Sequence, residues 1–182
     1  MLRISIFIVL PIFILSCGQK RTGTNRQNEI YKIVFATGGC YGKCPVQVFS
    51  IDSSLTIKFK GIEFTDFEGL YTGTINRQYF DTLNVKLESV NYQQLDTIYS
   101  GTVDDLSTEL FIYYGTKVKH ITSAFNDLPD TVKSVYKWLS TLQKKMILRK
   151  TTDSINFETR IDKGLPPLRE KIKFTPPRIK ND

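Results

Sequence analysis

Polar and apolar residues alternate along several short segments of the chain, and this pattern predicts strands. It is clearest over residues 55–60, where every second residue is apolar, so that one face of the strand is buried and the other faces water. Other segments are rich in β-branched and aromatic residues and are also expected to be strands: residues 30–36, 46–52, 67–75, 109–114 and 117–123. Gly115 and Thr116 separate the last two, as in a two-residue hairpin turn.

Two further segments repeat apolar residues at intervals of three and four, which predicts amphipathic helices. The repeating residues are Phe80, Leu83, Leu87 and Val90 in the first segment, and Val132, Val135, Leu139 and Leu142 in the second. Asn76 precedes the first and is a residue type that caps helix N-termini. Asp127, with Pro129 just behind it, is expected to open the second.

The order of these elements, ββββαββα, predicts an α+β fold. We expect a mostly antiparallel sheet of about six strands with the two helices on one face, because hairpin-linked strands and amphipathic helices pack in this way. Residues 91–108 are polar and irregular, with Asp104 and Asp105 near their end. The domain is expected to span residues 30–145.

The first seventeen residues have the features of an export signal. Arg3 is followed by an uncharged stretch, residues 4–15, which is shorter than the roughly 20 apolar residues of a membrane-spanning helix. Residues 14–18, ending in Ser16-Cys17-Gly18, resemble the lipobox of bacterial lipoproteins. This resemblance implies removal of residues 1–16, lipid on Cys17, and attachment to a membrane of the cell envelope. Gly18, which follows Cys17, resembles the sorting context of outer-membrane lipoproteins. The alternative to a lipoprotein signal is an ordinary signal peptide that contains a cysteine.

The net charge of +7 lies in the flanks of the chain. Residues 30–143 are slightly acidic, so we expect no nucleic-acid partner, because such domains normally carry a basic patch on the fold itself. Residues 17–29 hold no large apolar side chain and are expected to be the lipidated cysteine and a flexible tether. Residues 146–182 are expected to be a basic, proline-containing tail, either disordered or loosely docked. Apolar and polar residues alternate over 155–161, which indicates an additional edge strand. The positive charge of the tail indicates, as an alternative, binding to anionic lipid or to the cell wall.

With Cys17 lipidated, Cys40 and Cys44 remain as a pair. Exported proteins keep disulfides, and a glycine-containing turn brings residues four apart within bridging distance, so a structural disulfide is expected. Two alternatives stay open for the same cysteines. They could form a thiol–disulfide redox site, or bind copper or zinc together with His120, the only histidine. A phosphate-binding loop is excluded, because the glycine spacing is too short and no hydroxyl residue follows Lys43.

The segment from Gly39 to Pro45, with a strand on either side, resembles a family of bacterial domains of unknown function marked by a G-C-x-G-x-C-P loop. Asp104 or Asp105 falls where that family tends to have an acidic loop residue. The resemblance covers about residues 30–142 and implies an exported or lipid-anchored α+β domain. It implies no known activity.

No arrangement of residues carries a catalytic signature, so the chain is expected to be a non-catalytic binding domain rather than an enzyme, with no cofactor and no metal. The alternative is a redox protein using Cys40 and Cys44. Besides the membrane, an envelope protein or a glycan is the expected partner. Loops carry most binding residues, so the candidate contact residues are Tyr41, Lys43, Asp104 and Asp105.

Overall fold

The computed structural model of the chain describes residues 29–100 and 104–165. The expected signal peptide, the lipid attachment at Cys17 and almost all of the tether lie outside these residues, as does the tail beyond residue 165. Within the described ranges, no helix is both long enough and apolar enough to cross a membrane.

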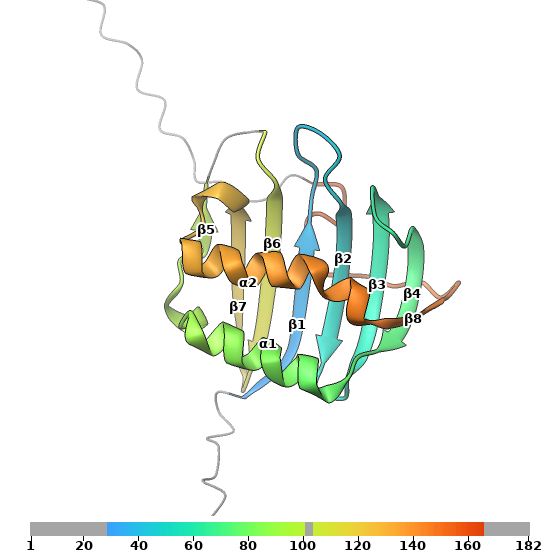
Figure 1. Cartoon of the computed structure of the whole chain (residues 1–182), viewed down its shortest axis with the longest axis horizontal. Coiled ribbons are helices and arrows are strands. Elements are labelled where there is room, and N and C mark those ends of the chain that lie inside the picture. The colour runs from blue at the N-terminus through green and yellow to red at the C-terminus, as the bar shows by residue number, and fades with distance from the viewer. Residues whose placement is uncertain (1–28, 101–103, 166–182) are drawn as a thin grey trace, which may run out of the picture.

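A single eight-stranded sheet forms the centre of the molecule (Figure 1). Its strands are β1 (Ile30–Thr37), β2 (Val46–Asp52), β3 (Thr56–Glu63), β4 (Gly69–Thr74), β5 (Ile98–Tyr99), β6 (Ser107–Tyr114), β7 (Lys117–Ala124) and β8 (Ile147–Lys150). They lie in the order β5-β7-β6-β1-β2-β3-β4-β8. All neighbours are antiparallel except the short β5, which runs parallel to β7. Strands β1 and β2 therefore occupy the middle of the sheet.

Two helices cross one face of this sheet (Figure 1). Helix α1 (Arg77–Ser89) begins where Asn76 accepts a hydrogen bond from the Gln78 amide at 2.9 Å, as the capping pattern predicts. Helix α2 (Asp130–Thr141) has Pro129 as its N-cap. Asp127 does not open it, because that residue belongs to a short 3₁₀ turn, η3 (Phe125–Asp127).

The main core lies between the helices and the sheet. Phe35, Phe49 and Phe59 are cross-strand neighbours on β1, β2 and β3, and all three are fully buried. The ring of Tyr136, on α2, packs edge-on against Phe35 with the ring centroids 5.5 Å apart. Each such side chain contributes about 1.5–3 kcal/mol to folding through its burial, so this row holds the helices on the sheet.

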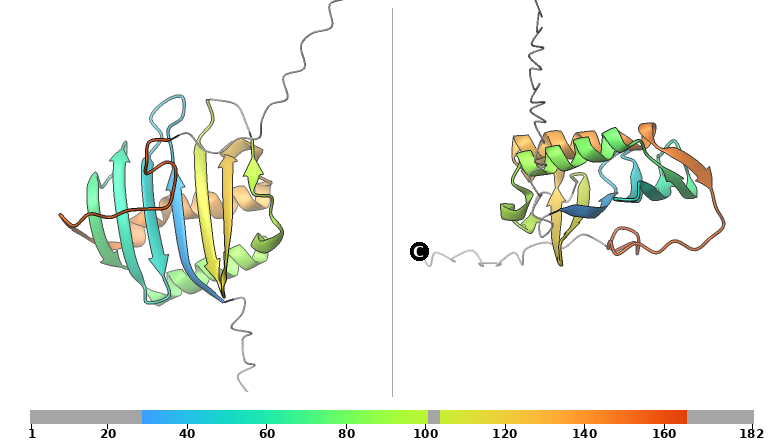
Figure 2. Two further views of the ribbon diagram at one scale, coloured as in Figure 1. Left: turned by 180° about the vertical axis from the view of Figure 1, so that it is seen from behind. Right: turned by 90° about the horizontal axis from the view of Figure 1, so that it is seen from below.

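The opposite face is covered by the C-terminal strap, which we define as residues 151–165 (Figure 2, left). The strap has no regular strand, yet it buries Ile155, Phe157 and Ile161 against Val34 and Val48 of the central strands. Figure 2 (right) shows the helices on one side of the sheet and this segment on the other. The middle of the sheet is thus enclosed on both faces.

Polar contacts also attach the strap to the sheet. Lys60 of β3 forms an ion pair with Asp162 at 2.7 Å. Glu109 of β6 is fully buried and accepts a hydrogen bond from the backbone amide of Arg160 at 2.8 Å. Burial raises the pKa of the Glu109 carboxyl.

The α+β class, the mostly antiparallel sheet and the helix pair agree with the expectation from sequence, but the strand count and order do not. Two short strands were missing from the expected order, β5 within the polar residues 91–108 and β8 after α2. The fold also continues beyond residue 145, because β8 pairs with β4 and the strap packs on the sheet. The alternating residues 155–161 bury their apolar side chains without forming the edge strand that they suggested.

Candidate functional site

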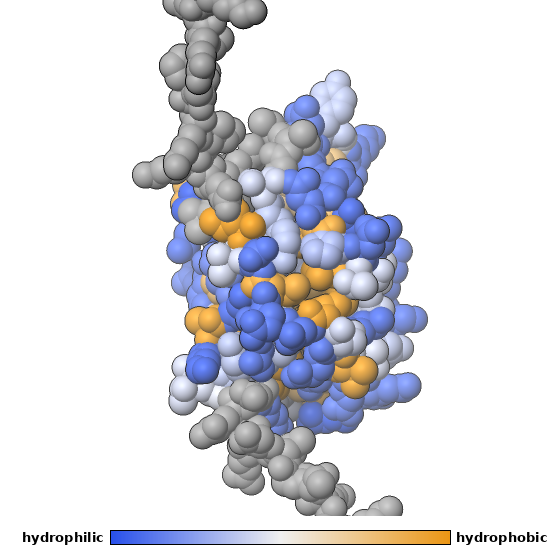
Figure 3. Space-filling view, turned by 90° about the vertical axis from the view of Figure 1, so that its left-hand side faces the viewer, coloured by the Kyte–Doolittle hydropathy of each residue, from blue (hydrophilic) through white to orange (hydrophobic). Residues whose placement is uncertain are grey.

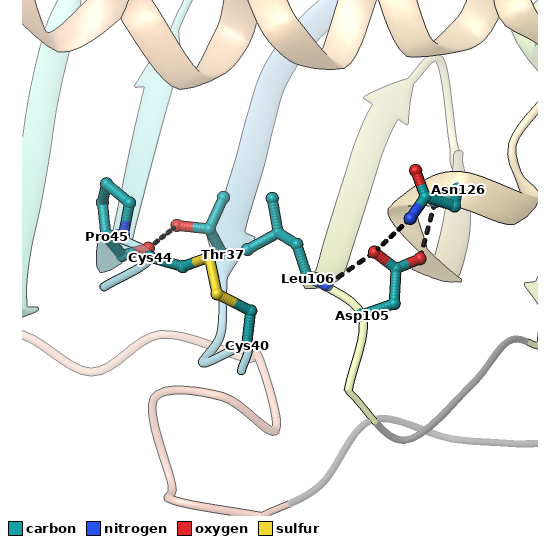
Figure 4. Close-up of a disulfide and its surroundings, with 7 residues drawn as sticks. All are labelled: Thr37, Cys40, Cys44, Pro45, Asp105, Leu106 and Asn126. Carbon is teal, nitrogen blue, oxygen red and sulfur yellow. Dashed lines mark hydrogen bonds between the residues drawn. A yellow bond between two sulfur atoms is a disulfide. The ribbon is translucent and has the colours of Figure 1, made fainter. Parts of the chain in front are cut away.

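The connection between β1 and β2 forms a tight loop at one end of the sheet. Cys40 and Cys44 are joined by a disulfide within this disulfide loop, residues 38–45, and their Cα atoms are 5.7 Å apart (Figure 4). Gly42 lies between them with φ +133°, a conformation that residues with a side chain rarely adopt. The glycine-containing turn therefore closes the small ring that the sequence predicts.

Hydrogen bonds hold the base of the disulfide loop on the sheet. The Thr37 hydroxyl, at the end of β1, donates to the Pro45 carbonyl at 2.6 Å (Figure 4). The Gly38 amide donates to the Ser107 carbonyl of β6 at 2.8 Å. A Cβ atom at position 38 would come within 2.2 Å of the Ser107 hydroxyl oxygen, so only glycine fits there without a shift.

The two aspartates expected as contact residues, Asp104 and Asp105, lie near this loop and have different surroundings. The backbone carbonyl of Asp104 accepts a hydrogen bond from the Tyr41 amide at 3.2 Å. The carboxylate of Asp105 accepts three, from the Leu106 amide at 2.8 Å, the Asn126 amide at 2.7 Å and the Asn126 side-chain amide at 3.0 Å (Figure 4). Asp105 thus connects the start of β6 to η3.

The four candidate contact residues therefore divide into two groups. Tyr41 is 89% exposed, and Lys43 and Asp104 are exposed as well. Asp105 is part-buried, and both of its carboxylate oxygens already accept hydrogen bonds. Three of the candidates are accessible to a partner, whereas Asp105 is a structural residue.

The exposed apolar side chains are scattered over the described part of the molecule. The large ones are spread over five strands and helices and over loops of the described residues: Tyr31, Tyr41, Ile62, Phe64, Val85, Val118, Ile147 and Leu165. On the side of the molecule near β5, hydrophobic surface is broken into small areas between hydrophilic ones (Figure 3). Tyr41 has the highest exposed fraction of this group, and it lies in the disulfide loop.

The surroundings of the cysteines bear on the redox and metal alternatives. Strand β2 begins at Val46, two residues after Cys44, so neither cysteine lies at a helix N-terminus of the kind that lowers thiol pKa values at many redox sites. His120 lies in the middle of β7 with its ring stacked on Phe111, the centroids 3.9 Å apart, and burial lowers its pKa. Over residues 29–100 and 104–165, no three His, Cys, Asp or Glu side chains are grouped as a metal site requires.

Sequence reasoning did not identify the residues that support this site. Thr37 and Ser107 attach the disulfide loop to the sheet, and Asn126 attaches the acidic loop, residues 104–106, to η3. None of the three belongs to a recognisable motif. The one local signal was the Asn126-Asp127 pair before Pro129, which marks a turn. It does not reveal that Asp105, distant in sequence, accepts the hydrogen bonds of that turn.

We predict that the adjacent aspartates differ in their effect on stability. Replacing Asp105→Ala removes three hydrogen bonds to a carboxylate and should lower the free energy of unfolding by about 2 kcal/mol. Asp104→Ala keeps the hydrogen bond between the backbone carbonyl and the Tyr41 amide, and it should change the free energy of unfolding by less than about 0.5 kcal/mol. Urea unfolding of the purified chain measures both, and equal losses would contradict the structural role of Asp105.

Comparison with known proteins identifies a family for this chain. No match was found among curated proteins. A family model described as a domain of unknown function, DUF6438, matches residues 31–143, which include the disulfide loop, the acidic loop and both helices. The matched segment is more than half of the chain, and the protein belongs to this family.

Proposed function

We propose that this chain is an exported lipoprotein, held to a membrane of the cell envelope by lipid on Cys17, whose domain binds a partner through the disulfide loop. The contact surface consists of Tyr41, Lys43 and Asp104. The partner is an envelope protein or a glycan, and binding is not coupled to catalysis.

The exposure of Tyr41 carries this proposal. A tyrosine that is 89% exposed at a loop tip gains nothing for folding, because its ring remains in water. Tyrosine is, however, one of the residues that contribute most to binding when a partner covers it. Lys43 and Asp104 add one charge of each sign nearby, since Asp104 is hydrogen-bonded through its backbone to Tyr41. An aromatic ring flanked by both charges suits a polar protein surface or a glycan.

The position of the loop in the fold supports the same function. The loop joins β1 and β2, the central strands, whose residues 33–37 and 47–51 are all buried. The disulfide and the Thr37–Pro45 hydrogen bond further restrict its conformations. A preordered loop loses little conformational entropy when it binds, which favours affinity.

We expect a photo-crosslinking residue at position 41 to capture the partner in intact cells. Replacing Tyr41 by p-benzoylphenylalanine should give one adduct of defined mass, because the benzophenone occupies the proposed contact. The matched control carries the same residue in place of Val85, which is 68% exposed on α1. Equal adducts at both positions, or none at position 41, would count against the binding surface.

A second experiment tests the anchor. Cells fed an alkyne-bearing palmitate should label the full chain, and Cys17→Ser should abolish both the label and membrane sedimentation, because it removes the thiol that carries the lipid. Cys44→Ser is the control, since the expected lipidation does not involve that residue. Persistent label in the Cys17→Ser chain would disprove attachment at this cysteine.

The thiol–disulfide redox alternative can be distinguished by a reduction potential. Structural disulfides have potentials below about −300 mV, whereas catalytic pairs lie at about −120 to −230 mV. We expect the Cys40–Cys44 pair of the purified full chain to fall in the lower range, measured by equilibration with redox buffers of known potential. A potential in the upper range would favour the redox function over the binding function.

A further inference from the structure

The face of the sheet opposite the helices contains a hollow that the disulfide loop does not line. Its volume is about 220 Å³, and it lies between strands β1, β2 and β3 and the C-terminal strap. Val34 and Phe157 are its apolar lining residues, while the other lining side chains are polar or charged. The strap crosses this face of the sheet in Figure 2 (left). The hollow is therefore a partly open space, lined mainly by polar side chains and formed by segments distant in sequence.

One pair of charges in the hollow is already neutralised. The Lys32 ammonium lies 3.4 Å from the Glu158 carboxylate and 4.6 Å from the centre of the Tyr113 ring. The Tyr113 hydroxyl donates a hydrogen bond to the same carboxylate. These contacts attach the strap to β1 and β6, so Lys32 and Glu158 form a wall of the hollow rather than a free binding group.

A second pair of charged residues, Asp52 and Lys58, has side-chain groups that are not used in hydrogen bonds or ion pairs with the described residues. Asp52 uses one carboxylate oxygen, Oδ1, to accept hydrogen bonds from the amides of Ser54 at 2.9 Å and Thr56 at 3.2 Å, whereas its Oδ2 makes no hydrogen bond with the described residues. Lys58 forms no hydrogen bond or ion pair with any side chain in the described part of the chain, Asp52 included. Asp52 and Lys58 thus line the same hollow without forming an ion pair with each other.

A hydroxyl group lies next to this cation. Ser50 is paired directly with Lys58 across β2 and β3, which brings their side chains to the same face at adjacent positions. Ser50 is only 9% exposed, and its hydroxyl makes no hydrogen bond within the described ranges. An ammonium and a hydroxyl at neighbouring positions, neither of them paired with another side chain of the described residues, are suitable donors for a carboxylate.

From this arrangement we infer that the hollow binds a small zwitterionic α-amino acid. Its carboxylate accepts hydrogen bonds from Lys58 and Ser50, and its ammonium group donates to Oδ2 of Asp52. A dianion such as phosphate is disfavoured, because Lys32 is already paired with Glu158 and the free carboxylate oxygen of Asp52 would repel the second charge. The volume lies below the roughly 300 Å³ at which typical ligand pockets begin, so it suits a small amino acid. This site is independent of the contact surface around Tyr41.

The probe for this site is L-alanine, titrated into the isotope-labelled full chain and followed by amide chemical shifts. Propionate lacks the amino group and ethylammonium lacks the carboxylate, so each satisfies only half of the site. We expect saturable shifts at Ser50 and at residues near the strap, with L-alanine binding about tenfold or more tightly than either fragment, the order of one charge-assisted contact. Propionate binding as tightly as L-alanine, or no saturable shift at all, would overturn the inference.

Two substitutions test the assigned roles. Lys58→Met removes the ammonium while keeping an unbranched side chain only one atom shorter. Asp52→Asn removes the charge while keeping an oxygen for the Ser54 and Thr56 amides. Each should weaken L-alanine binding about tenfold, while Lys144→Met, an exposed lysine outside the hollow, should leave it unchanged. Unaltered melting temperatures establish that the variants are folded. A folded Lys58→Met or Asp52→Asn chain that binds as tightly as the unsubstituted chain would refute the assignment.

Discussion

The structure depends on the burial of one antiparallel pair of strands, β1 and β2, on both faces. A strand has side chains on alternating faces, so a strand at the middle of a sheet needs a cover on each. The two helices cover one face through the phenylalanine row, and the C-terminal strap covers the other through Ile155, Phe157 and Ile161. Without the strap, Val34, Ala36 and Val48 would be exposed to water, which makes residues beyond α2 part of the folded domain.

The same strand pair anchors the disulfide loop. The loop begins and ends at the two most enclosed strands, so its base cannot move without disturbing the core. The disulfide closes only a small ring and contributes little loop-closure entropy. Its effect is therefore mainly local, restricting the conformations of the exposed segment that carries Tyr41. The acidic loop adds to this through Asp105, which joins β6 to η3.

The two faces of the sheet also differ in chemistry. The helix side is almost entirely apolar, as expected of a core that packs α1 and α2. The strap side combines apolar contacts with Lys32, Asp52, Lys58 and the buried Glu109, and the strap is irregular there. An irregular segment has backbone and side-chain polar groups without regular partners, so polar space remains between it and the sheet. The hollow on this side follows from covering a sheet with a strap instead of a helix.

The sequence by itself determined the elements whose pattern is local: six of the strands, both helices, the Asn76 cap, the turn at Gly115, and the pairing of cysteines four residues apart. These depend on side-chain periodicity and on backbone preferences within a few residues. Only the tertiary structure decided that β5 and β8 are strands, because two and four residues are too few to show a period. The tertiary structure alone distinguished Asp104 from Asp105 and placed the strap over Asp52 and Lys58. The reason is that the Asp105–Asn126 contacts and the contacts of the strap with the sheet join residues far apart in the chain.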